Sequence, residues 1–228
     1  MDYDYLDLNI SYTDMCESSV KEMHWHCKIF GSEDTASNIE VGTIEVVILD
    51  EDWLTDGRTL HQYATSEHYD NRIEWAFNSV NYQNELDPYS KNDFNSLILN
   101  GIKNDTTHLG PEGKVQIHGR VAYIDTFKIN KPYRNNGLGS KAMSDLIDFL
   151  SKLYVDFALI KPFPLEDDGF GSKEGIKKLI AFYKRFGFEL TEEYINIDKG
   201  EQPHMFLEIS QPEMVYLTAD DLEEDLEN

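Results

Sequence analysis

The chain has 228 residues with 43 acidic and 20 basic side chains, and its formal net charge is −23. This excess of negative charge disfavours non-specific binding to nucleic acid or to an anionic membrane, so we expect neither as a partner. The length suits one domain, no apolar run reaches the ~18 residues that span a bilayer, and the acidic N-terminus is unlike a signal peptide, so we expect a cytoplasmic protein.

The N-terminal half combines strands with helices and turn-rich segments. Residues 22–30 and 39–49 are rich in β-branched, aliphatic and aromatic side chains, and the polar turn between them predicts a hairpin. Apolar residues at helical spacing predict helices over 69–80 and 93–99. Glycine and proline then predict a loop over 106–114.

A strand runs into a helix through a glycine turn in the middle of the chain. β-Branched and aromatic residues predict a strand over 121–129, and Pro132 then stops strand pairing. Apolar residues at three- and four-residue steps predict a helix over 138–153. Gly137 and Gly139 would lie at its N-terminus, where unpaired N–H groups and the helix dipole favour a phosphate. An ordinary strand-to-helix turn is the alternative.

The common nucleotide-binding loops fit this turn poorly. A Walker loop needs Lys and then Ser or Thr after its last glycine, whereas Gly139 is followed by Ser140 and Lys141 in the reverse order. A dinucleotide-binding turn needs a third glycine, which is missing. A nucleotide-binding enzyme therefore stays only as a less favoured interpretation of this turn.

The turn resembles the acyl-CoA pyrophosphate loop of the GNAT superfamily of N-acetyltransferases. That loop has Arg or Gln, two residues, Gly, one residue, and then Gly or Ala. Arg134, Gly137 and Gly139 fit every specified position, and Tyr133 and Ile129 stand where the family usually has similar residues.

A second match lies farther along the chain. Residues 181–189 resemble the family's later helix and its exit, with Tyr183 shortly before a Gly-Phe pair. Between the two matches, residues 155–162 are typical of a buried strand. Together the matches cover about residues 119–210, but the Asn that the family often has near the start of the later helix is missing, because Gly175 or Ile176 stands there.

The resemblance implies an α/β (α+β) GNAT-like acyl-CoA N-acyltransferase fold, with a central, mostly antiparallel mixed sheet that is splayed at the cofactor site and flanked by helices. It implies one domain over 1–211, with acceptor-side strands and helices in 1–118 and the acetyl-CoA-binding core in 119–211. The acidic segment 212–228 is expected to be a tail. Most basic residues lie between Lys114 and Arg185, which suits a polyanionic cofactor and solvated helix faces equally well.

The activity implied is transfer of the acetyl group from acetyl-CoA to a primary amine by direct attack in a ternary complex. The cofactor would contact the main chain of the strand end and the glycine turn. These residues are Phe127, Lys128, Ile129, Arg134, Asn135, Asn136, Gly137, Leu138, Gly139 and Ser140.

Two side chains are candidates for proton transfer. Tyr183 stands where many family members have a Tyr that protonates the departing CoA sulfur, and a core residue is the alternative because Tyr183 also belongs to an apolar helical stripe. Asp125 is the candidate base, and strand alternation would place it on the same face as Tyr123 and Phe127. A solvated or paired carboxylate is the alternative for Asp125.

Two further sequence patterns add no residue to the predicted site. His24 and His26 would share a face of one strand, as two metal ligands must, but no further ligand is evident nearby, so we expect no metal. Residues 169–175 are rich in glycine but follow an acidic run, and we interpret them as a flexible connection. No motif identifies the amine acceptor. The oligomeric state is open, and a homodimer is possible. The main alternative to an enzyme is a non-catalytic acyl-CoA-binding or interaction module.

Overall fold

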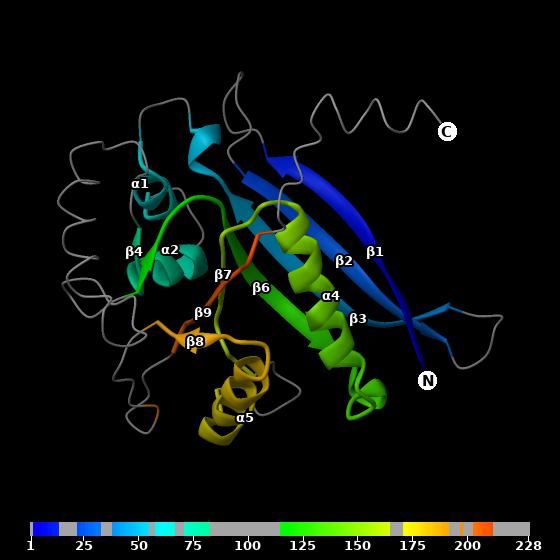
Figure 1. Cartoon of the computed structure of the whole chain (residues 1–228). Helices are drawn as coiled ribbons and strands as arrows, with labels where there is room; N and C mark the ends of the chain where they lie inside the picture. The colour runs from blue at the N-terminus through cyan, green and yellow to red at the C-terminus, as the bar shows by residue number, and fades with distance from the viewer. Residues whose placement is uncertain are drawn as a thin grey trace, which may run out of the picture.

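A seven-stranded sheet runs through the protein, with the strand order β1-β2-β3-β6-β7-β9-β8 (Figure 1). The computed structural model describes residues 2–13, 22–32, 38–54, 58–66, 71–82, 115–164, 171–191, 197 and 203–211. The strands are β1 (Asp2–Thr13), β2 (Glu22–Ser32), β3 (Asn38–Leu49), β6 (Val121–Ile129), β7 (Phe157–Ile160), β8 (Glu189–Leu190) and β9 (Met205–Glu208). A separate small sheet pairs β4 (Asn81–Tyr82) with β5 (Gln116–Ile117).

All neighbouring strands of the large sheet are antiparallel except β6 and β7, which are parallel. Parallel neighbours need a crossover connection, and α4 (Leu138–Lys152) supplies it. β9 enters between β7 and β8 although it follows both in the chain. The sheet is therefore mixed and mostly antiparallel, as the resemblance implied.

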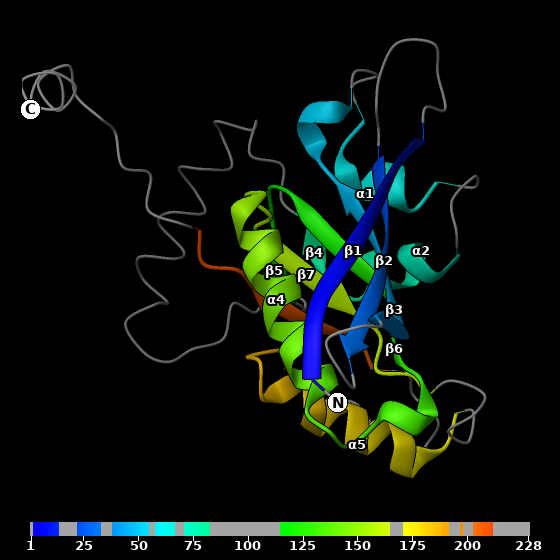
Figure 2. The same cartoon turned by 90° about the vertical axis from the view of Figure 1, so that its right-hand side faces the viewer.

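Helices cover both faces of the sheet, as Figure 2 shows. On one face, α4 and α5 (Lys173–Lys184) pack on a buried cluster that includes Trp25, Ile44 and Ile124. On the other face, α1 (Leu60–Ala64) and α2 (Asn71–Asn78) pack on a second cluster that includes Phe77 and Tyr123. Because neighbouring β6 residues contribute to different clusters, each face of this strand is buried near its start.

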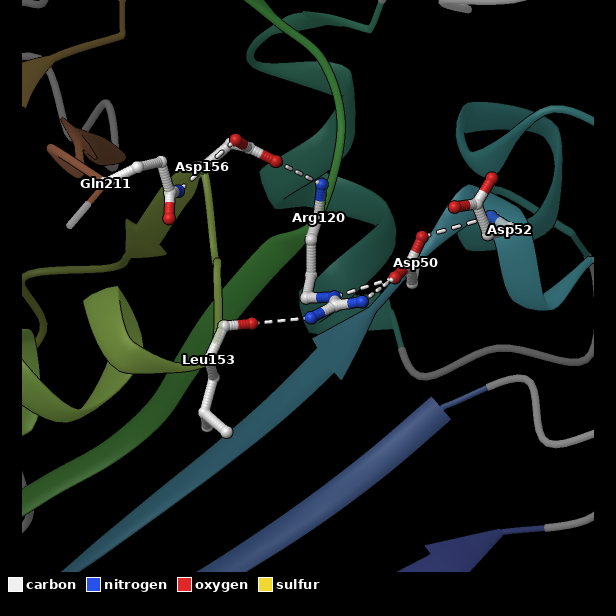
Figure 3. Close-up of polar contacts among 6 residues, drawn as sticks. All are labelled: Asp50, Asp52, Arg120, Leu153, Asp156 and Gln211. Carbon is white, nitrogen blue, oxygen red and sulfur yellow. Dashed lines mark hydrogen bonds and ion pairs between the residues drawn. The ribbon is translucent and has the colours of Figure 1, made fainter. Parts of the chain in front are cut away.

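Arg120 joins several segments at the end of the sheet away from the glycine turn (Figure 3). Its Nε donates to Asp50 Oδ2 at 2.6 Å, and its Nη1 donates to the carbonyl oxygen of Leu153 after α4. Its main-chain N–H donates to Asp156 Oδ2 at 2.8 Å, and Gln211 Nε2 donates to Asp156 Oδ1 at 3.3 Å. We call these five residues the Arg120 clasp, and it ties β3, β6 and α4 together where they meet.

Most of the predicted elements are confirmed. The hairpin is β2 and β3, and the strand and helix around the glycine turn are β6 and α4. The helix predicted over 69–80 is α2, and the buried strand over 155–162 contains β7. The expected helix at 93–99, the loop at 106–114 and the acidic tail at 212–228 lie outside the described residues.

Two parts of the prediction need correction. β1 was not predicted, although it forms a long antiparallel ladder with β2. The segment interpreted as a flexible connection over 169–175 ends in the first turn of α5, because Ser172 caps this helix and its Oγ accepts a hydrogen bond from the Gly175 N–H at 3.1 Å. Among the described helices, none combines the length and the apolar character needed to cross a membrane.

Candidate functional site

The glycine turn at the start of α4 has the geometry that its sequence predicts. After β6 the chain makes a short 3₁₀ turn, η2 (Lys131–Tyr133), and Gly137 then adopts a left-handed conformation with φ of 79°. A Cβ on Gly137 would meet no atom within 4 Å, so its backbone angle, and not space, favours glycine. At Gly139 a Cβ would lie 3.4 Å from the Ile129 side chain, which is an ordinary contact.

No side chain caps the N-terminus of α4. The first intrahelical bond is donated by the Lys141 N–H to the Gly137 oxygen at 3.1 Å, so the N–H groups that precede it have no partner within the helix. Asn135, Asn136 and Gly137 are exposed, whereas the side chain of Leu138 is buried. An anion could therefore approach these donors from solvent, where the helix dipole is positive.

Arg134 fixes this turn to the end of β6. Its Nε donates a hydrogen bond to the main-chain oxygen of Ile129 at 2.7 Å, and its side chain is half-buried. The arginine of the motif thus bridges the strand end and the turn.

β6 and β7 separate next to this turn. Their pairing ends at Ile124 and Ile160, whereas β6 continues to Ile129 without β7 beside it. The Asn130 N–H donates to Val41 in β3, so alternation turns the peptide groups of Lys128 toward β3 and those of Phe127 and Ile129 toward the opening.

Because of this alternation, only some of the three strand residues predicted to contact the cofactor face the opening. The Lys128 oxygen lies so close to β3 that a Cβ on Gly42 would approach it to 2.2 Å. Phe127 can therefore present its main-chain N–H and oxygen to a ligand in the opening, and Ile129 can present its N–H, because its oxygen already accepts from Arg134. The main chain of Lys128 is turned away. The expected splay of the sheet at this point is confirmed.

A bulge changes the faces of β6 at Asp125. Glu45 of β3 is opposite Thr126 and Val46 is opposite Ile124, which leaves Asp125 without an opposing residue. Phe127 packs against the cluster beneath α4 and α5, whereas Tyr123 lies in the cluster beneath α1 and α2. The prediction that Asp125 shares the face of Tyr123 is confirmed, because Asp125 is paired with Arg72 of α2. The prediction that Phe127 lies on that face is wrong, because the extra residue shifts the alternation by one.

Asp125 is paired with α2. Arg72 Nη1 lies 2.8 Å from Asp125 Oδ2, and the Asp125 side chain is only 13% exposed. This is the paired carboxylate that the sequence left as an alternative.

Tyr183 lies on the inner face of α5. It is 4% exposed, its ring contacts Phe182 edge-on at 5.2 Å, and Phe188 lies 5.8 Å away between ring centroids. Burial raises the pKa of Tyr183 above its ordinary value, so the phenol stays protonated at neutral pH. The side chain thus has the protonation state of a proton donor and the packing of a core residue.

Phe182, the neighbour of Tyr183, reaches the divergence of the sheet. The ring centroids of Phe182 and Phe127 are 6.0 Å apart. A Cβ on Gly139 would lie 3.8 Å from the Cζ atom of Phe182. The end of β6, the start of α4 and the end of α5 therefore meet at one place. The two segments matched in the sequence are brought together there.

Two residues with no recognisable motif lie on the other side of the divergence. Lys161 directly follows β7, and His204 directly precedes β9. Only the pairing of β7 with β9 makes them neighbours, so the sequence held no local signal for them. Among the described residues, no three His, Cys, Asp or Glu side chains are grouped to hold a metal ion.

Comparison with solved structures returns N-acetyltransferases. The NatC complex bound to Gag peptide and CoA is 10% identical, with 81% of this chain and 71% of that chain covered and a TM-score of 0.38. Arabidopsis thaliana Naa50 with a bisubstrate analogue is 25% identical over 43% of this chain and 58% of that chain, with a TM-score of 0.28. The ribosomal-protein-S18-alanine N-acetyltransferase from Escherichia coli is 24% identical over 42% and 60%, with a TM-score of 0.30.

These scores are low, and the chain spans less than two thirds of the second and third of these structures. No family model matches the sequence, and no curated protein matches it. The fold assignment therefore rests on the molecule itself: the mixed sheet, the splay of β6 from β7 and the glycine turn at α4. This is the GNAT-like fold that the sequence resemblance implied.

Proposed function

We propose that this protein is an N-acetyltransferase that moves the acetyl group of acetyl-CoA to a primary amine by direct attack in a ternary complex. The observation that carries the proposal is the opening between β6 and β7 beside the uncapped, glycine-containing start of α4. The end of β6 offers main-chain donors to a thioester carbonyl, and the start of α4 offers main-chain donors to a diphosphate.

The cofactor would bind along this line. The diphosphate would lie on the turn from Arg134 to Ser140, where the exposed N–H groups and the helix dipole favour negative charge. The pantetheine arm would bond the main chain of Phe127 and Ile129. We leave the main chain of Lys128 out of these contacts because it is turned toward β3.

The reaction forms a C–N bond and breaks a C–S bond. The amine nitrogen attacks the thioester carbon, and the Phe127 N–H stabilises the developing oxyanion by ~3 kcal/mol, the typical effect of one such donor. The CoA thiolate departs and takes a proton from Tyr183. The amine nitrogen loses a proton to a base, for which Asp125 is the candidate, and that proton returns through solvent to the tyrosinate.

Acetyl transfer by the Tyr183→Phe variant tests this proposal. Loss of a positioned general acid should lower kcat by about 100-fold or more and leave the KM for acetyl-CoA nearly unchanged. Tyr154→Phe is the matched control, because Tyr154 is 47% exposed beyond the end of α4. The measurement is CoA thiol release across a panel of primary amines, with unfolding curves to show that both variants fold.

The alternatives give different results. A non-catalytic acyl-CoA-binding module would bind CoA in calorimetry but show no thiol release above background in wild type or in Tyr183→Phe. A nucleotide-binding enzyme would be protected against thermal unfolding by ATP and not by CoA. Either result would reject acetyl transfer.

A further inference from the structure

Four polar residues meet where β6 and β7 separate. Ile124 and Ile160 form the last pair of these strands, so Asp125 and Lys161 begin the two diverging ends. Met205 is opposite Ile160, and His204 therefore lies beside Lys161 on the next strand. Arg72 joins the group through its ion pair with Asp125.

This group lies on the α2 side of the sheet. Leu159 and Phe206 belong to the cluster beneath α1 and α2, and strand alternation places Lys161 and His204 on the same side. The Nζ of Lys161 lies 5.0 Å from the ring centroid of Trp75, which is in α2. The glycine turn and α4 lie on the opposite side, so the group faces the opening from the side away from the proposed cofactor loop.

The charges of the group are not balanced among the residues that the structure describes. Arg72 is neutralised by Asp125 at 2.8 Å, but no described carboxylate lies within ion-pair distance of Lys161. Instead, the ammonium lies between the Trp75 ring and the Phe163 ring, which is 5.2 Å away. Burial and then the charge on Arg72 lower the pKa of Lys161.

His204 adds a polar atom that has no hydrogen-bond partner in the described part of the chain. Its side chain is 7% exposed, and its Nε2 makes no hydrogen bond with any described residue. A buried polar atom of this kind normally bonds to a partner or to a ligand. Trp75, which is 51% exposed although it carries a large apolar ring, offers a flat surface beside the same place.

We propose that Lys161, His204 and Trp75 bind a carboxylate group of the acceptor, so that the substrate is an amine that also carries a carboxylate, as amino acids do. An ammonium without a described counter-ion and an imidazole with a free nitrogen match the charge and the hydrogen-bonding capacity of a carboxylate. The site lies beside the opening between β6 and β7, so an amine on the same small molecule could reach the thioester. This inference rests on the proposed acetyl transfer.

Calorimetry on the CoA-loaded protein tests the proposal directly. The probes are the common amino acids, each compared with its carboxamide, which keeps the amine and removes the negative charge. Wild type should bind at least one acid about tenfold or more tightly than its amide, the range of a charge-assisted hydrogen bond. Lys161→Met should abolish that preference, and Lys161→Arg should retain part of it.

Lys152→Met is the control, because Lys152 is an exposed lysine at the far end of α4. His204→Gln should weaken the preference without changing the dissociation constant of CoA. If wild type binds no acid more tightly than its amide, the proposal is rejected, and the same holds if Lys161→Met keeps the preference in a folded protein. A protein that binds no CoA would instead reject the proposed function, and the acid and amide comparison would then be made on the unloaded protein.

Discussion

His204 is a buried histidine whose protonation opposes folding. Burial, with a smaller contribution from the charge on Lys161, lowers its pKa from 6.5 to about 4. Between these pH values the unfolded chain binds a proton that the folded protein does not. Stability should therefore be full above about pH 6.5 and fall by up to about 3 kcal/mol as the pH approaches 4.

Urea unfolding at a series of pH values measures this loss. His204→Gln cannot take up the proton, so its stability should decline less between about pH 6.5 and 4 than that of wild type. Substitution of His118, whose side chain is exposed, is the control. Parallel pH profiles for wild type and His204→Gln would contradict the prediction.

At the scale of a single element, the two glycines at the start of α4 have different structural requirements. Gly137 has φ of 79°, which disfavours any side chain, whereas a Cβ on Gly139 fits in ordinary contact. Gly137→Ala should therefore destabilise the protein by about 1–2 kcal/mol and weaken CoA binding, because the turn must change shape. Gly139→Ala should change the stability by less than about 1 kcal/mol.

The two alanine variants are each other's control, since they add the same methyl group two residues apart. Urea unfolding gives their stabilities, and calorimetry gives their dissociation constants for CoA. A destabilisation by Gly139→Ala that equals or exceeds that of Gly137→Ala would show that packing, and not backbone angle, limits this turn.

At the scale of the whole molecule, the Arg120 clasp and the proposed site lie at opposite ends of β6. Arg120→Met would leave the buried carboxylate of Asp50 without its cation and the Leu153 oxygen without its donor. We expect a loss of about 2–4 kcal/mol, reduced from the effect of a fully buried pair because the Arg120 side chain is 30% exposed.

The dissociation constant of CoA should stay the same at a temperature where Arg120→Met is folded, because the clasp contacts none of the turn residues. Urea unfolding and calorimetry measure the two quantities. Asp52→Asn is the control for stability, since Asp52 contributes its main-chain N–H, and not its carboxylate, to Asp50. A large change in CoA affinity in Arg120→Met would show that the two ends of β6 are coupled.

Short-range patterns predicted the parts of this protein that form locally. The periodicity of 138–153 predicted α4, and the apolar runs around residue 45 and residue 125 predicted β3 and β6. β1 was not predicted, although Leu6, Leu8 and Ile10 alternate with polar residues as in a strand with one apolar face. α1 was missed because its five residues are too few to show a helical period.

The sequence by itself determined the glycine turn, its arginine and the strand and helix on either side, because these depend on backbone preferences within about 20 residues. Only the tertiary structure decided that Phe127 lies on the face opposite Asp125, since the bulge depends on the register between β6 and β3. It also decided that Lys161 and His204 are neighbours, because β9 inserts beside β7 from more than forty positions away in the chain. Pairing between distant strands follows from the packing of the whole sheet, and a single sequence read locally carries no signal for it.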